Sequence, residues 1–162
     1  IEHLLALGHD TVHHISGPVE SFSAKAREDV WRKVLKENGR RVPDPVRGDW
    51  SPNAGYIAAQ ELLSRETPTA IFVANDQMAL GTQRALLEAG LTIPGDVSVI
   101  GFDNIDEAVA FPTPLTSVAQ DWEVLGRDAL DAALDALSGG EPSSFTIPTR
   151  LIIRDSTGPA PH

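Results

Sequence analysis

Two kinds of hydrophobic pattern alternate along the chain: short continuous apolar runs, and longer stretches with apolar residues at helical spacing. The first kind is typical of buried strands and the second of amphipathic helices. The apolar runs predict strands over residues 11–16, 46–50, 70–74, 97–102, 115–118 and 149–154. The helical pattern predicts helices over residues 2–7, 23–37, 51–65, 76–89 and 120–137. This alternation predicts βαβ units and therefore an α/β fold, a parallel sheet flanked by helices.

Residues near the expected helix starts support these boundaries. Ser23 is a candidate N-cap of the second helix, and Ser51 followed by Pro52 predicts the start of the third. Asp76 is a candidate N-cap of the fourth helix, because aspartate is favoured at that position. The Gly/Pro-rich residues 155–162 lack any such pattern, and we expect this tail to fray.

Composition and charge narrow the possible functions. The 162 residues are enough for one α/β domain, or for one domain and part of another, and 41% of them are hydrophobic, as in globular proteins. With 13 Lys and Arg against 23 Asp and Glu, the net charge is −10. Nucleic acids are bound by basic surfaces, so we do not expect this chain to bind DNA by itself. No apolar run is long enough to predict a membrane span.

The sequence offers little of the chemistry that enzymes and metal proteins need. There is no cysteine, and the histidines of "GHDTVHH" lack the spacing of a zinc site, so we expect no metal and no other cofactor. Neither a GxSxG nor a phosphate-binding Walker motif is present, which disfavours an enzyme. The chain begins at Ile1 within a helical pattern, and we interpret it as part of a longer protein.

Polar and aromatic residues at the predicted strand ends form a candidate ligand site. Parallel sheets bind ligands beyond the carboxyl ends of their strands. Trp50, Asn75, Asp103 and Gln120 each end or follow a predicted strand, and Arg27 lies one turn into the helix after the first strand. Hydroxyl-binding side chains around a flat aromatic ring suit a neutral, hydroxyl-rich ligand such as a sugar.

Each of these residues also has an ordinary structural interpretation. Asn75 and the pair Asp103-Asn104 are common in turns, and Trp50 can simply pack in the core. Arg27 can be a solvated helix residue. The pattern alone leaves both interpretations open.

Three longer stretches resemble the LacI/GalR family of bacterial transcription regulators. They are "EHLLALGHDTVHHISGP", "AIFVANDQMALGTQRALLEAGLTIPGDVSVIGFDN" and "FPTPLTSVAQDWEVLGRDAL". The resemblance also includes "GDWS" at 48–51 and the closing "RLIIRDST", in the same order along the chain. The resemblance implies a type I periplasmic-binding-protein-like core of two subdomains joined by three crossovers, with the effector bound between them. It implies that 1–117 belong to the C-terminal subdomain, 118–148 to the N-terminal subdomain, and 149–162 to the return strand and tail.

The resemblance also assigns roles to single residues. The ligand-binding residues it implies are Ser23, Arg27, Trp50, Asn75, Asp103 and Gln120. The dimer contacts it implies are Leu80, Arg84 and Phe111. The chain departs from the family at Ala119, where many members have a basic residue, and at Pro112-Thr113-Pro114.

The expected function is therefore the effector-sensing part of a repressor. The resemblance implies a cytoplasmic homodimer that binds a sugar or a related polyol, has no catalytic activity, and contacts DNA only through an N-terminal headpiece outside this sequence. A transport-type periplasmic sugar-binding protein is the alternative, and an enzyme on a similar sheet is a third possibility that lacks a nucleophile–base pair.

Overall fold

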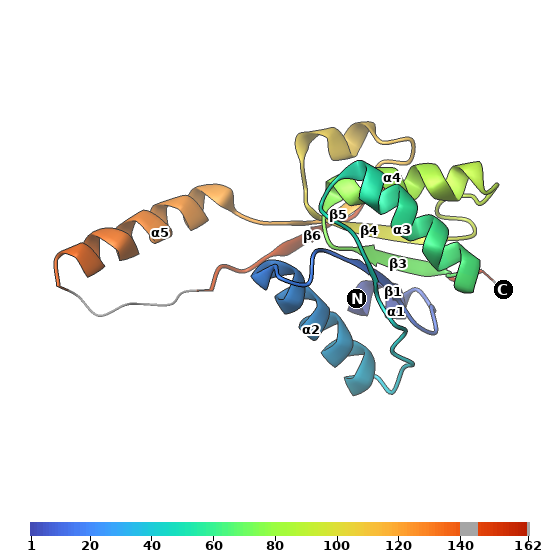
Figure 1. Cartoon of the computed structure of the whole chain (residues 1–162), viewed down its shortest axis with the longest axis horizontal. Coiled ribbons are helices and arrows are strands. Elements are labelled where there is room, and N and C mark those ends of the chain that lie inside the picture. Colours follow the sequence, from blue (N-terminus) through green and yellow to red (C-terminus); the bar gives the residue numbers. More distant parts are fainter. Residues whose placement is uncertain (140–145, 162) are drawn as a thin grey trace.

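A computed structural model describes residues 1–139 and 146–161 and shows a six-stranded sheet with helices on both faces (Figure 1). The helices are α1 (Glu2–Ala6), α2 (Phe22–Glu37), α3 (Pro52–Arg65), α4 (Asp76–Glu88), the 3₁₀ helix η1 (Asp106–Ala110) and α5 (Trp122–Leu137). The strands are β1 (His13–Ser16), β2 (Val46–Arg47), β3 (Ala70–Val73), β4 (Ser98–Asp103), β5 (Thr116–Ala119) and β6 (Arg150–Ile152). The predicted α/β fold is confirmed. The helix η1 had no counterpart in the sequence pattern.

The strand order places the ends of five strands at one edge of the sheet. The order is β2-β1-β3-β4-β5-β6; the first five strands run parallel, and β6 pairs with β5 in the antiparallel direction. Because parallel strands share a direction, the carboxyl ends of β1 to β5 lie at the same edge. This is the edge at which a doubly wound sheet binds its ligands.

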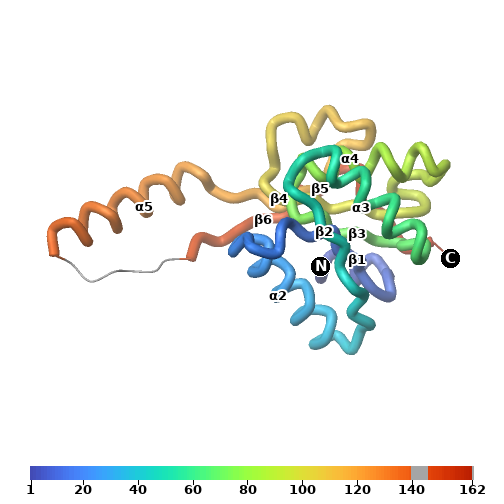
Figure 2. The backbone as a smooth tube through the Cα atoms, viewed as in Figure 1, coloured from blue at the N-terminus to red at the C-terminus, as the bar shows by residue number. Residues whose placement is uncertain are grey.

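Two apolar layers hold the helices onto the sheet, α3 and α4 on one face and α1 and α2 on the other (Figures 1 and 2). Strand β3 shows how the chain supplies both layers. Ile71 and Val73 pack on the α3–α4 side, and Phe72 packs with Trp31 of α2 on the opposite side. Successive strand residues point to opposite faces, so a continuous apolar run such as Ala70–Val73 predicts a strand buried on both sides.

Glycines bring α3 and α4 into close contact. A Cβ atom on Gly55 would overlap the backbone of Met78, and one on Gly81 would overlap the backbone carbonyl of Pro52. Both collisions are with main-chain atoms, which cannot rotate away as a flexible side chain can. The distance between these helices is therefore set by two residues without side chains.

The helix starts correct two predictions and confirm a third. Ser51 caps α3 as predicted, its hydroxyl accepting the backbone N–H three residues later at 3.1 Å. Helix α2 is capped by Ser21 and not by Ser23, because Ser21 is the last extended residue and Ser23 is already helical. Helix α4 is likewise capped by the amide of Asn75, with φ −149°, and Asp76 is the first helical residue.

The tail does not fray over residues 155–161, and for these residues the prediction was wrong; His162 lies outside the described residues. Ser156 is fully buried; its hydroxyl donates to the carbonyl of Val99 at 2.6 Å. The carbonyl of Gly158 accepts from the buried ring of His9 at 3.2 Å. The tail supplies partners for polar groups at the amino end of β4, which would otherwise be buried without them.

Helix α5 projects away from the sheet (Figures 1 and 2). None of its residues is buried, and Leu130, Leu134 and Leu137 are 60%, 53% and 85% exposed. Their spacing places them on one face of the helix. Within the described ranges, no helix combines the length and apolar composition that crossing a membrane requires.

Candidate functional site

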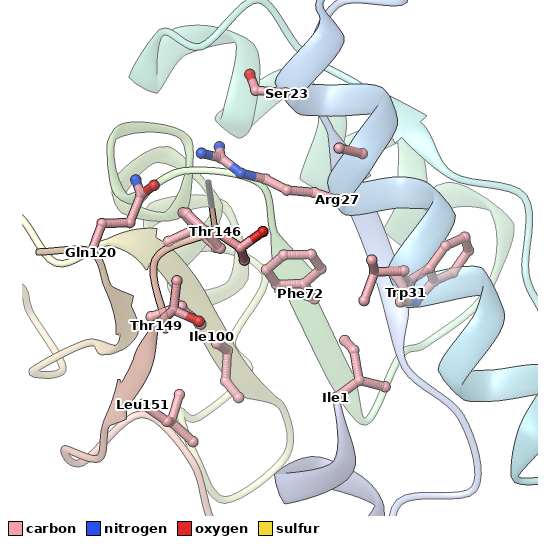
Figure 3. Close-up of a pocket in the computed structure, with 14 residues that line it drawn as sticks. Ile1, Ser23, Arg27, Trp31, Phe72, Ile100, Gln120, Thr146, Thr149 and Leu151 are labelled. Carbon is pink, nitrogen blue, oxygen red and sulfur yellow. The ribbon is translucent and has the colours of Figure 1, made fainter. Parts of the chain in front are cut away.

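Arg27, Asp103 and Gln120 meet at the carboxyl edge of the sheet. Arg27 extends from α2 toward Gln120, which directly follows β5 (Figure 3). Its Nη1 donates to the carbonyl of Ala74 at 2.6 Å, and its Nη2 lies 3.5 Å from the Oδ1 of Asp103 at the end of β4. The same Oδ1 accepts from the Nε2 of Gln120 at 3.0 Å. Three residues from distant parts of the chain thus form one polar cluster. The sequence predicted this, because each of them lies at or near the carboxyl end of a parallel strand.

Aromatic rings hold the guanidinium of Arg27. Its central carbon lies 3.8 Å from the ring centre of Phe102 and 5.7 Å from that of Trp50, both within the range of cation–π attraction. Burial lowers the pKa of Arg27, and the nearby Asp103 opposes that shift. Sequence reasoning missed Phe102. The strand alternation was a usable signal, because it places Phe102 on the same face as Ile100.

The side chain of Asn75 makes its hydrogen bonds within the protein, next to the polar cluster. Its Nδ2 donates to the backbone carbonyl of Trp50 at 3.1 Å and to Gln77 at 2.9 Å, while its Oδ1 caps α4. The side chain of Asn75 is thereby satisfied within the protein, although the sequence predicted that it faces the ligand cleft. The indole of Trp50 packs against Gly17, where any Cβ would overlap it.

A cavity of about 590 Å³ opens beside the polar cluster, a size that suits a small molecule. Ser23, Arg27 and Gln120 line its polar end, and an apolar wall including Phe72 and Leu151 lines the rest (Figure 3). Asp103 lines a second hollow, which it shares with Gln77, Asn104 and Trp122 among others. Of the six predicted ligand-binding residues, Ser23, Arg27 and Gln120 therefore line the larger cavity. Asp103 lines the second hollow, and Trp50 and Asn75 line neither of the two.

Backbone conformations unusual for side-chain-bearing residues are concentrated here. Among the described residues, the non-glycine residues with positive φ are Trp50 (78°), Asp103 (106°) and Asn104 (52°). Such conformations cost free energy and persist where surrounding contacts enforce them, often at functional sites. Burial raises the pKa of Asp103, while Arg27 and Gln120 oppose the rise.

The cluster carries the hydrogen-bonding groups that a hydroxyl-rich ligand requires. Arg27 and the amide of Gln120 supply hydrogen-bond donors, and the carboxylate of Asp103 supplies acceptors, a combination that matches sugar hydroxyls. Within residues 1–139 and 146–161, no three His, Asp or Glu side chains are grouped closely enough to hold a metal ion.

The residues expected at a dimer contact lie in different environments. Leu80 and Arg84 are exposed on the outer face of α4, where Arg84 pairs with Glu88 at 2.8 Å. Phe111 is only 6% exposed and packs in the core beneath α4, so it offers little surface to a partner.

The family model for the periplasmic binding protein-like domain matches residues 1–157. The chain belongs to this family. This periplasmic binding protein-like domain is 38% identical over 160 residues to the lactose operon repressor of Escherichia coli K12, covering 97% of the chain and 44% of the repressor. It is 37% identical over 164 residues to the HTH-type transcriptional repressor PurR of Escherichia coli O1:K1, covering 98% of the chain and 48% of PurR.

Solved structures agree with the sequence comparison. The domain superimposes on the lac repressor dimer bound to operator and the anti-inducer ONPF with a TM-score of 0.91 at 38% identity, covering 97% of this chain and 56% of that one. It matches the CelR–cellobiose complex with a TM-score of 0.92 at 31% identity, covering 96% and 49%.

The resemblance to the ligand-binding region of LacI-family regulators is thus confirmed. The domain spans about half the length of the curated relatives it matches. Those relatives carry the names of repressors and not of enzymes, in agreement with the prediction of a non-catalytic protein.

Proposed function

We propose that this domain is the effector-sensing part of a LacI-type bacterial transcriptional regulator. A small hydroxylated molecule, a sugar or related polyol, binds at the Arg27–Asp103–Gln120 cluster and changes the DNA affinity of the whole protein. The observation that carries the proposal is the convergence of these three side chains beside a cavity of about 590 Å³. Effector and DNA affinities are then linked reciprocally.

The donor set favours a sugar as the effector. The planar donors of Arg27 and the acceptor of Asp103 match a rim of hydroxyl groups, and Phe72 lines the same cavity with an apolar ring for a sugar face. The match to a regulator in complex with cellobiose supports this choice.

The proposal includes the organisation of the whole protein. Residues 1–117 and the return segment 149–162 form one subdomain, and 118–148 contribute α5 to a second subdomain. The projection of α5 from the sheet and the return of the chain as β6 support this division. The regulator is a cytoplasmic homodimer that contacts DNA through a headpiece outside this sequence.

Calorimetry with a sugar panel on the full-length regulator tests the site. Arg27→Ala and Asp103→Ala each remove one side of an ion pair at the cavity, and we expect at least about a tenfold loss of effector affinity. Lys33→Ala, on an exposed part of the same helix as Arg27, is the matched control and leaves the affinity unchanged. Normal binding by both site variants would refute the assignment.

Sedimentation tests the proposed dimer face on α4. Leu80→Asp places a charge on that face and is expected to shift the regulator toward monomer, because an unpaired buried charge opposes association. Val19→Asp, at a residue 64% exposed before α2, is the control and leaves the dimer intact. A dimer that survives Leu80→Asp excludes this face.

A transport-type periplasmic binding protein is the alternative function, since the matched family model describes that kind of domain. The residues encoded immediately before Ile1 distinguish the two. A helix-turn-helix upstream supports the regulator, and a signal peptide supports the transport protein.

A further inference from the structure

The turn after β4 begins with a residue in an unfavourable backbone conformation. Asp103 has a φ of 106°, beyond the left-handed helical region, whereas Asn104, at 52°, lies in that region, which asparagine tolerates. This turn carries the carboxylate that meets Arg27 and Gln120. Other groups must therefore fix the turn if Asp103 is to keep that position before a ligand arrives.

Two fully buried side chains bind successive N–H groups of this turn. The N–H of Asn104 donates to the hydroxyl of Ser117 at 3.1 Å, and the N–H of Ile105 donates to the Oδ2 of Asp76 at 2.9 Å. The hydroxyl of Ser117 in turn donates to the Oδ1 of Asp76 at 2.7 Å. Asp76 and Ser117 thus form a connected pair, here called the turn clamp, in which both carboxylate oxygens accept hydrogen bonds.

The packing around Asp76 makes room for its carboxylate. A Cβ atom on Gly101 would overlap its Oδ1, so the glycine in β4 makes room for it. Asp76 is also the first residue of α4, where the helix dipole favours a negative charge. Burial raises the pKa of Asp76, while the hydrogen bonds from Ser117 and Ile105 oppose the rise.

The capping prediction for Asp76 fails to explain this arrangement. Asn75 already caps α4, so the helix start does not require a carboxylate at position 76. The side chain of Asp76 points instead to the turn and to β5, and joins α4, β4 and β5 beneath the ligand-binding cluster.

We propose that Asp76 and Ser117 are positioning residues for the effector: the turn clamp fixes Asp103 so that its carboxylate is presented to the ligand together with Arg27 and Gln120. This inference rests on the proposed function of the cluster. It also connects the ligand site to α4 through a single side chain, because the residue that holds the turn begins the helix whose outer face carries Leu80 and Arg84.

The test uses the full-length regulator and measures effector affinity by calorimetry and stability by thermal unfolding. Asp76→Asn keeps the shape but loses one acceptor, and Ser117→Ala loses the hydroxyl that joins Asn104 to Asp76. Thr82→Val is the matched control. It removes a fully buried hydroxyl from α4 that bonds to the carbonyl of Met78, away from the turn.

We expect Asp76→Asn and Ser117→Ala to weaken effector binding by at least about tenfold, and Ser117→Thr to restore it. Thr82→Val should keep the affinity within about twofold, even if its melting temperature falls as much as that of Asp76→Asn or Ser117→Ala. A purely structural role predicts that affinity follows the melting temperature in all variants, and that result would overturn the inference. If Asp76→Asn does not fold, the Ser117→Ala and Ser117→Thr pair decides the question alone.

The outcomes separate the inference from the proposed function. Loss of binding in Arg27→Ala and Asp103→Ala, with normal binding in both clamp variants, refutes the turn clamp and leaves the site in place. Normal binding in Arg27→Ala and Asp103→Ala refutes the site, and the clamp with it.

Discussion

Helices α4 and α5 carry similar amphipathic patterns but lie in opposite environments. Both begin with a side-chain cap, Asn75 for α4 and Asp121 for α5. Helix α4 buries a whole face between the sheet and α3, whereas no residue of α5 is buried. A hydrophobic pattern therefore predicts which face of a helix packs against other elements. Whether those elements are present depends on the rest of the protein.

The exposed apolar face of α5 is the unusual part of this comparison. Most of the stability of a helix in a protein comes from packing of its apolar face, and leucines on one side normally pack against a partner. The second subdomain proposed above would be that partner. The body of the domain comprises the sheet with α1 to α4. It has an apolar core on each face of the sheet and does not depend on a second subdomain for its packing.

The largest expected difference between α4 and α5 is in the change of stability when a glycine of each helix is replaced by alanine. Gly81→Ala would drive a methyl group into the backbone of α3, and we expect a loss of at least about 3 kcal/mol of unfolding free energy. Gly126→Ala in α5 meets no atom within 4 Å, and should raise helix content, contributing up to about 1 kcal/mol to that helix. Urea unfolding and circular dichroism measure the two effects. Equal effects at both positions would contradict the comparison.

Acid should weaken the body of the domain through His14. Its ring is stacked on Phe72 at 4.8 Å and lies 5.1 Å from Trp31, and burial lowers its pKa to about 4 from an ordinary 6.5. The unfolded chain then takes up a proton more readily than the folded one. Stability is complete above about pH 6.5 and declines as the pH falls toward 4, by up to about 3 kcal/mol.

Urea unfolding at several pH values between 7 and 4.5, followed by tryptophan fluorescence, measures this decline. His14→Phe removes the titrating group and should reduce the pH dependence. His3, His9 and His13 keep a slope of the same sign, because burial lowers their pKa values too. An unchanged slope in His14→Phe would show that other groups dominate.

The smallest effect is expected on the exposed face of α5. Leu134→Asp should change the unfolding free energy of the body by less than about 0.5 kcal/mol, because the side chain is 53% exposed. Leu86→Ala in α4, where the side chain is fully buried, should cost about 2–5 kcal/mol and is the positive control. A loss above about 1 kcal/mol for Leu134→Asp would mean that α5 packs on the body of the domain.

The sequence predicted the parts of the structure that depend on local pattern. The order of strands and helices follows from hydrophobic period, and Arg27, Asp103 and Gln120 were brought together by the rule that parallel strands end at one edge. Asn75 and Asp76 are both good caps, so a shift of one residue was enough to exchange their roles.

The roles that the sequence did not predict depend on distant residues. Asp76 acts through Ser117, 41 positions later, and through the space left by Gly101. Phe102 became part of the site only because α2 places Arg27 against its ring. No local pattern records such pairings.

The contacts of the tail with the start of the chain have a consequence for the order in which the chain folds. The ring of His9 and the carbonyl of Gly158 are 149 positions apart in sequence, and the N–H of Ala160 donates to the carbonyl of Leu7. A ribosome releases the first of these residues long before the last. Until then, the ring of His9 and the hydroxyl of Ser98 lack the carbonyl they share. Such distant contacts slow folding, so the growing chain must wait for residues 158–160 before the amino end of the sheet can close.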